Sequence, residues 1–217
     1  MDYPDHEIYN QLYAKYLDRR PASKLVDLAG DLDEKIVIDL CGGAGEIAAL
    51  SAQRGAAYVE LVDECHKMIK HTSMWTVGVE VRVDSVRSAL ELMRCSLPKV
   101  DVAFCRQAVN YWLNETTVFL LSQVMQSGGL FIFNTFNQKP SSGIVLKKYF
   151  HDGYEFMEIH QMVDDMVHHV QVRAGLPPHS TSFKWISRDR FHELLSPHFE
   201  IEEMVDCNTS IYICKNH

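Results

Sequence analysis

Residues 37–45 read Val37-Ile38-Asp39-Leu40-Cys41-Gly42-Gly43-Ala44-Gly45, a β-branched run that passes directly into a glycine-rich segment. The predicted strand begins at Lys35, and a continuous β-branched run of this kind is typical of a strand buried on both faces of a parallel sheet. A helical pattern follows over residues 46–54, and Gly55 ends it. A buried strand, a glycine turn and a helix in this order predict a strand–helix crossover unit.

The same alternation continues along the chain to residue 136. Strand-like runs are expected at residues 58–62, 79–83, 100–105 and 130–136, and helical runs at 64–72, 85–94 and 115–126. The pair Gly128-Gly129 reads as a turn before the last of these strands. Strand and helix patterns that trade places predict a right-handed βαβ series with a parallel sheet.

The segments outside this series follow other patterns. Residues 8–28 are helical in pattern, and Arg19-Arg20-Pro21 interrupts them. After Pro140, residues 157–163 and 166–173 read as two strands joined at Asp164-Asp165, with a third strand at 182–186. The chain then ends with a helix at 188–195, capped by Ser187, and a hairpin of residues 199–205 and 210–214.

These patterns divide the chain into four predicted parts. They are an N-terminal helical cap at residues 1–30, a core at 31–136, an inserted lid at 137–186, and a final helix with hairpin strands at 187–217. We predict an α/β fold with a Rossmann-like, seven-stranded, mostly parallel sheet and helices on both of its faces. A closing antiparallel hairpin and a small antiparallel β lid, inserted after the fifth strand, complete it.

The composition excludes several classes of protein. The 217 residues are 47% hydrophobic and 23% charged, which is enough to bury one core and excludes a disordered chain. The net charge of -8 disfavours a nucleic-acid partner, which needs a basic surface. The apolar runs are too short to cross a membrane, and the N-terminus lacks the pattern of a signal peptide. Six cysteines without a Cys-x-x-Cys pair predict a reduced, cytoplasmic protein without structural disulfides.

The glycine-rich segment is the expected ligand site. In a doubly wound sheet, ligands bind at the carboxyl ends of the strands, and small residues there let a ligand approach the backbone. The spacing is not the dinucleotide motif, because Glu46 stands three residues after Gly43. An acid at a helix start also repels a pyrophosphate, so a cationic or zwitterionic ligand fits better.

Here the chain resembles the class I S-adenosylmethionine (SAM)-dependent methyltransferases. Their first motif, an acid followed by three alternate glycines, matches Asp39, Cys41, Gly43 and Gly45. Cys41 departs from the usual glycine and leaves slightly less room for the ligand. The resemblance implies that SAM is the cofactor and that the loop, with Gly42 included, binds it.

The resemblance extends to the acids that follow the next two strands. Asp63 matches the family's acid for the two ribose hydroxyls, and a carboxylate can accept both. Glu64 and Met68 are expected along the adenine, and Asp84 and Ser85 at its amino group. A helix cap or a local turn is the alternative role for both aspartates.

Further candidates follow the predicted fourth strand. Arg106 either faces the pocket or forms an ion pair with Asp101 or Glu115. Asn110 and Tyr111 are similar to the Asn-Pro-Pro-Tyr motif of nucleobase amino-methyltransferases, but the prolines are absent. That difference disfavours a nucleic-acid substrate further.

The remaining site predictions concern catalysis and the N-terminal helix. Catalytic contacts are expected from Asn110, Tyr111 and Asn134. The N-terminal helix is expected to close over the cofactor, with Tyr9, Tyr16, Arg19 or Arg20 near the methionine carboxylate. The lid histidines, His160, His168, His169 and His179, have no metal-ligand spacing, so either a base or solvated side chains are expected there.

The resemblance implies a methyltransferase that acts on a small-molecule acceptor and releases S-adenosylhomocysteine. One alternative keeps the fold and makes SAM the sole substrate, which is cyclised to azetidine-2-carboxylate with release of methylthioadenosine. Another alternative is a SAM-binding protein without catalysis. No metal, nucleic-acid or membrane partner is predicted.

Overall fold

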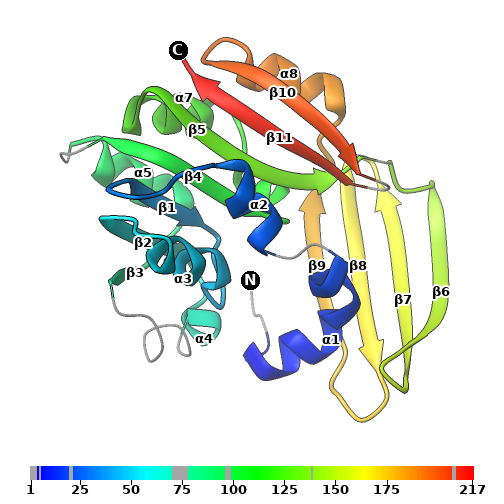
Figure 1. Ribbon diagram of the computed structural model, residues 1–217. Helices are drawn as coiled ribbons and strands as arrows, with labels where there is room; N and C mark the ends of the chain where they lie inside the picture. The colour runs from blue at the N-terminus through cyan, green and yellow to red at the C-terminus, as the bar shows by residue number, and fades with distance from the viewer. Residues whose placement is uncertain are drawn as a thin grey trace.

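A seven-stranded sheet organises the molecule (Figure 1). The computed structural model describes residues 4, 6–19, 22–69, 78–95, 99–137, 139–206 and 209–217. The strands of this sheet are β1 (Ile36–Leu40), β2 (Tyr58–Asp63), β3 (Val79–Val83), β4 (Val100–Arg106), β5 (Met125–Phe136), β10 (Phe199–Asp206) and β11 (Thr209–Asn216). Their order is β10-β11-β5-β4-β1-β2-β3.

The order of the strands places a crevice beside β1. β1 pairs in parallel with β2 on one side and with β4 on the other. The connection after β1 leads to β2, and the connection after β4 leads to β5, so the two connections run to opposite sides of the sheet. Ligands bind at such a switch point in open α/β sheets. β11 is antiparallel to both β5 and β10. The predicted mostly parallel sheet with a closing hairpin is confirmed.

Helices cover both faces of this sheet, as predicted. α2 (Ala22–Leu28) and α3 (Glu46–Gln53) pack on one face, around the buried residues Val37 and Phe104. α5 (Val86–Met93), α7 (Glu115–Val124) and α8 (Arg188–Leu195) pack on the other, around Phe131 and Phe133. Two short helices, α4 (His66–Ile69) and α6 (Val109–Trp112), follow β2 and β4 at the carboxyl edge of the sheet.

A second, four-stranded antiparallel sheet lies between β5 and α8 in the chain, and we call it the lid. It consists of β6 (Gly143–His151), β7 (Tyr154–Val163), β8 (Met166–Arg173) and β9 (His179–Lys184). The sequence predicted the last three strands, the final one displaced to residues 182–186, and missed β6. β6 is an edge strand whose exposed face carries Ile144, Leu146 and Phe150, so burial leaves no alternating pattern in its sequence.

The first helix, α1 (His6–Arg19), packs against the lid rather than against the large sheet (Figure 1). Gln11 Oε1 accepts a hydrogen bond of 2.8 Å from Arg173 of β8, and the Tyr13 hydroxyl lies 2.8 Å from Nδ1 of His179 of β9. α1 and the lid therefore form one wall, which faces the carboxyl edge of the large sheet.

The predicted turn at Gly128-Gly129 lies within the range of β5, at an interruption of its pairing with β4. Met125 pairs with Val100 and Leu130 pairs with Val102, so residues 126–129 lie between the paired positions. Gly128 has a φ of 79°, which only glycine adopts readily. The two glycines therefore mark an irregular segment, and regular pairing resumes at Leu130, the predicted start of the strand.

None of the described helices is long and apolar enough to cross a membrane.

Replacement of Asn216 by alanine should destabilise the fold by about 1–3 kcal/mol. The Asn216 side chain donates to the carbonyls of Ser122, Met125 and Gln126 at 3.1, 3.3 and 3.1 Å, where α7 ends and β5 begins. Chemical denaturation would measure the loss. Lys215→Ala, at an exposed neighbour, is the control and should change stability by less than about 0.5 kcal/mol.

Candidate active site

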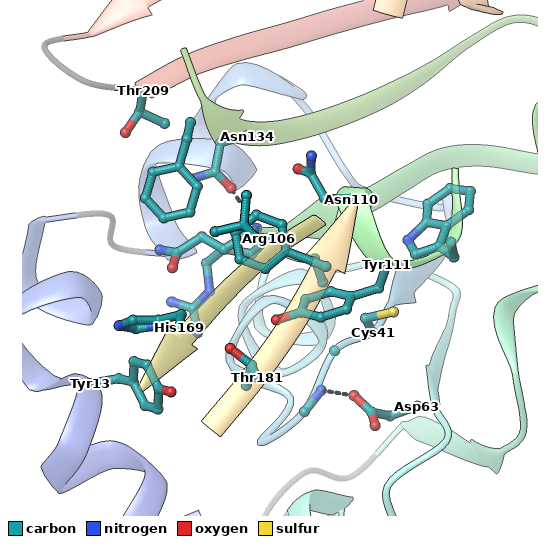
Figure 2. A pocket seen from close by; sticks show the side chains of 18 of the residues that line it. Tyr13, Cys41, Asp63, Arg106, Asn110, Tyr111, Asn134, His169, Thr181 and Thr209 are labelled. Atoms are coloured by element: carbon teal, nitrogen blue, oxygen red, sulfur yellow. Dashed lines mark hydrogen bonds between the residues drawn. The ribbon is translucent and has the colours of Figure 1, made fainter. Parts of the chain in front are cut away.

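One large cavity opens at the carboxyl ends of β1, β2 and β4, between that edge of the sheet and the wall made by α1 and the lid (Figure 2). Its volume is about 1170 Å³. The predicted site residues that line it are Tyr9, Asp39, Cys41, Gly42, Gly43, Asp63, Glu64, Met68, Asp84, Ser85, Arg106, Asn110, Tyr111 and Asn134. Gly45 does not line it but caps the start of α3. The side chain of Tyr16, and Arg20 as a whole, lie outside the described residues.

The loop after β1 has an alternating backbone conformation. Cys41, Gly43 and Gly45 have φ angles of 55°, 53° and 76°, which are the three positions of the predicted motif. Glycine adopts such angles without penalty, whereas cysteine does so at a cost of about 1 kcal/mol. Cys41 also hydrogen-bonds the Cys105 thiol, and this bond together with burial raises the pKa of Cys41.

Gly42 is required for a different reason. A Cβ atom there would lie 2.6 Å from Asp39 Oδ2 and 2.9 Å from Leu61 Cγ, both too short for any side chain. The Gly42 N–H donates to the Val62 carbonyl at 3.2 Å, which holds the loop against β2. The absence of a side chain therefore lets the loop lie flat against the strand ends.

Asp63 ends β2 and is held in place by the backbone. Its Oδ2 accepts the Gly43 N–H at 2.9 Å, and its Oδ1 accepts the Cys65 N–H at 2.8 Å. Burial raises the pKa of Asp63, and these two hydrogen bonds act against that effect. A carboxylate has about four acceptor positions, so each oxygen keeps one for a ligand in the cavity.

Asp39 is a buried acid at the floor of the cavity. It is 1% exposed, and its Oδ2 accepts the Ala48 N–H at 3.2 Å. Its Oδ1 is buried and has no hydrogen-bond partner within the described part of the chain. Burial raises the pKa of Asp39 to about 7, although Arg106 and the Ala48 N–H oppose the shift. A carboxylate in this state favours a cationic ligand.

The acid after β3 is positioned by a helix start. Asp84 Oδ1 accepts the Ser85 N–H at 2.7 Å, and Ser85 caps α5 through the Ser88 N–H at 3.2 Å. Both residues line the cavity. The local turn and the helix cap that were expected as the alternative role are therefore present. Asp84 and Ser85 also lie on the cavity wall.

Arg106 faces the cavity, but the ion partners predicted for it are wrong. Its Nη2 lies 2.5 Å from Glu46 Oε2, at the start of α3. Asp101 bonds instead with the Ile36 N–H, and Glu115 with Arg190. The sequence obscured this pair because sixty positions separate the two residues, and only the sheet order brings β4 beside the loop after β1.

The predicted catalytic residues lie together at the end of β4 and β5, and two of them also hold the backbone. Asn134 Oδ1 accepts the Gln107 N–H at 2.9 Å. Asn110 Oδ1 accepts the Thr135 hydroxyl at 2.6 Å, and its Nδ2 donates to the Lys184 carbonyl of β9 at 3.1 Å. Tyr111 lies in the cavity with its ring 5.7 Å from that of Phe183 (Figure 2). Asn110 therefore ties the large sheet to the lid.

The α1 side of the cavity is aromatic. The Tyr9 and Tyr13 rings stack with their centroids 4.6 Å apart, and both line the cavity. Burial raises the pKa of Tyr9, so its hydroxyl stays protonated.

The lid contributes residues to the cavity, and the sequence had named two of them, His160 and His169, as either a base or solvated side chains. Glu158, His160, His169 and Thr181 line it from β7, β8 and β9. Glu158 and His160 lie two residues apart on β7, and this spacing is a signal that could have placed them together, because alternate residues share one face of a strand. Within the described ranges, no cluster of three metal-ligating side chains is present.

The chain is similar in sequence to a curated protein over part of its length. No protein-family model matches the chain. A curated ubiquinone biosynthesis O-methyltransferase from Nitrosomonas europaea is 29% identical over 141 residues, which make up 64% of this chain. The match covers 56% of that protein, so the matched stretch spans little more than half the length of this relative.

Solved structures match over the whole chain. An amino pentose methyltransferase from Micromonospora echinaspora, solved with SAM bound, has a TM-score of 0.72 at 12% identity over 100% of both chains. A sugar N-methyltransferase from a Streptoalloteichus species has a TM-score of 0.69 at 11% identity, covering 100% of this chain and 96% of that chain. The chain therefore has the fold of solved SAM-dependent methyltransferases, which is the fold that the resemblance implied.

Proposed function

We propose that this chain is a SAM-dependent methyltransferase that acts on a small-molecule acceptor and releases S-adenosylhomocysteine. The observation that carries the proposal is the cavity beside β1, where the positive-φ loop, Asp39 and Asp63 face one space. The curated relative and the structural neighbours are also methyltransferases, which supports SAM as the cofactor.

The residues present fit SAM. SAM supplies an electrophilic methyl group on a cationic sulfonium, beside a ribose and a methionine ammonium group. Asp63 has an acceptor position on each oxygen for the two ribose hydroxyls. The buried Asp39 Oδ1 lacks a partner among the described residues, and the ammonium group of SAM would provide one.

The cavity has room for a second molecule. Its volume of about 1170 Å³ exceeds the usual range for one drug-sized ligand, roughly 300–1,000 Å³. The part of the cavity that SAM would leave free lies against the lid. We propose that residues 137–186, which include the lid, form the acceptor side of the cavity. The protein's contribution is to position the acceptor in line with the sulfonium methyl and to exclude water.

The alternative for the same cavity is a second SAM-consuming reaction. Cyclisation of the aminobutyrate arm would release azetidine-2-carboxylate and methylthioadenosine without any acceptor. Tyr111 is the residue that favours it, because an aromatic ring in the cavity can hold a sulfonium cation while the arm folds back. The room on the lid side favours methyl transfer.

The nucleoside product separates these reactions. The purified protein is incubated with SAM alone, and with SAM plus a pool of small metabolites, and the products are identified by mass spectrometry. S-adenosylhomocysteine formed only with the pool is the expected result. Methylthioadenosine from SAM alone would replace methyl transfer by cyclisation. Calorimetric SAM binding with neither product would point to a non-catalytic binding protein.

A further inference from the structure

The inner face of the lid is polar where a covered sheet is ordinarily apolar. Val145, His160, His169 and Thr181 lie directly opposite one another across β6, β7, β8 and β9, so their side chains share one face. Glu158 lies two residues before His160 on β7 and shares that face. All five line the cavity. Burial of polar groups is unfavourable without hydrogen-bond partners, so the polar side chains on this face need an explanation.

Two histidines and one acid form the centre of this face. The His160 and His169 rings are stacked, with centroids 4.5 Å apart and planes 12° apart. His160 Nε2 lies 3.4 Å from Glu158 Oε2, and Glu158 is 2% exposed. The carboxylate therefore sits directly beside the imidazole pair.

His169 is the member that points to a ligand. It is 8% exposed, and its Nε2 is buried and makes no hydrogen bond within the described part of the chain. Figure 2 shows its ring in the cavity, with Thr181 and Arg106 around the same space. A buried imidazole nitrogen facing a cavity needs a partner, and a bound molecule can supply it.

We propose that the inner face of the lid binds an acceptor with a protic nucleophile, a hydroxyl or an amine, which donates its hydrogen to His169 Nε2. This inference rests on the proposed methyl transfer. The new bond joins the acceptor oxygen or nitrogen to the methyl carbon, and the carbon–sulfur bond breaks with its electron pair left on sulfur. The acceptor proton passes to His169 Nε2.

The electrostatics of the cluster keep His169 neutral and able to accept a hydrogen bond. Burial, and then the neighbouring His160, lower the pKa of His169 to about 4, so the ring is neutral and its nitrogen can accept a hydrogen bond. The positive charge of the sulfonium disappears from the cavity in the same step that forms the imidazolium. Glu158 and a side-chain hydrogen bond with Gln171 raise the pKa of His169, so they stabilise that imidazolium and offset part of the effect of burial.

Matched small probes test the proposal directly. Protein labelled with ¹⁵N-histidine and saturated with S-adenosylhomocysteine is titrated with millimolar phenol and aniline, and separately with anisole and N,N-dimethylaniline. The first two carry a donor hydrogen, and the other two are methylated isosteres without it. We expect phenol, aniline or both to shift the His169 Nε2 resonance, and neither isostere to do so. Which of the two protic probes acts distinguishes a hydroxyl from an amine acceptor.

Two variants complete the test. His169→Phe assigns the resonance and should weaken binding of the active probe about tenfold, the effect of one hydrogen bond. His168→Phe is the matched control, since His168 is the preceding residue on β8 and is exposed on the opposite face, with its Nδ1 2.8 Å from Ser182 Oγ. It should leave probe binding unchanged.

The outcomes are decisive for the acceptor site. Equal shifts from protic and aprotic probes, or no shift of any histidine resonance from any probe, would overturn the proposal even if His169→Phe did not fold. Calorimetry with SAM gives a separate result. Failure of the wild type to bind SAM would remove the proposed function, whereas SAM binding without a probe effect would remove only the role of His169.

Discussion

Replacement of Asp63 by alanine should weaken SAM binding by about 100-fold or more. The wild-type carboxylate has one acceptor position left on each oxygen, and two charge-assisted hydrogen bonds to the ribose would be lost together. The Gly43 and Cys65 N–H groups would also lose their acceptor, which loosens the loop. Isothermal calorimetry with SAM measures the effect.

Asp101→Ala provides the matched control for this loss. Asp101 is also an aspartate that accepts a backbone N–H, that of Ile36 at 2.9 Å, but it lies near the start of β4, at the opposite edge of the sheet. Its removal should lower stability and leave SAM affinity within about twofold. Equal loss of affinity in the two variants, or none in Asp63→Ala, would show that Asp63 does not bind the ribose.

Asp39→Asn should make the protein more stable above pH 7, by up to about 4 kcal/mol. The pKa of Asp39 is about 7 in the folded state and about 4 in the unfolded chain. Between these values the folded state binds more protons, so the wild type loses stability as pH rises from about 4 to 7 and then levels off. Asparagine keeps an acceptor for the Ala48 N–H and does not ionise.

The measurement is the difference in unfolding free energy between the two proteins from acidic to alkaline pH. We expect no gain near pH 4 and the full gain above pH 7. Asp27→Asn, at an exposed carboxylate paired with Arg54, is the control and should differ from the wild type by less than about 1 kcal/mol throughout. A variant less stable than the wild type above pH 7 would refute the assignment.

The same variant should bind SAM more weakly, by about tenfold. Asp39 Oδ1 is the buried oxygen that has no partner among the described residues and that we assign to the ammonium group. A buried acid that is kept for a cationic ligand lowers the stability of the ligand-free protein. Tighter SAM binding as pH rises through 7 in the wild type, and not in Asp39→Asn, is the accompanying result.

Much of the large sheet could be predicted from the sequence because its signals are local. The run at residues 37–40, the glycines after it and the acid at Asp63 each follow from short-range rules for strands, turns and strand ends. The three positive φ angles at Cys41, Gly43 and Gly45 show that the motif is a backbone requirement, even where cysteine stands for glycine.

The lid was less predictable because several of its apolar residues are exposed and several of its polar residues are buried. β6 exposes Ile144, Leu146 and Phe150, so its apolar residues lie on the wrong face for the pattern rules. β7 and β8 bury Glu158 and His169, which are residues that sequence reasoning places on the surface.

By itself, the sequence determined which candidate site residues follow each strand: a glycine loop follows β1, and acids follow β2 and β3. Only the tertiary structure decided which distant groups meet there. Arg106 reaches Glu46 because β4 pairs with β1, and His169 faces the cavity because the lid turns its inner face toward the carboxyl edge of the large sheet. The physical reason is range: a motif reflects neighbours within a few residues, whereas charge pairs and acceptor contacts depend on sheet order and packing.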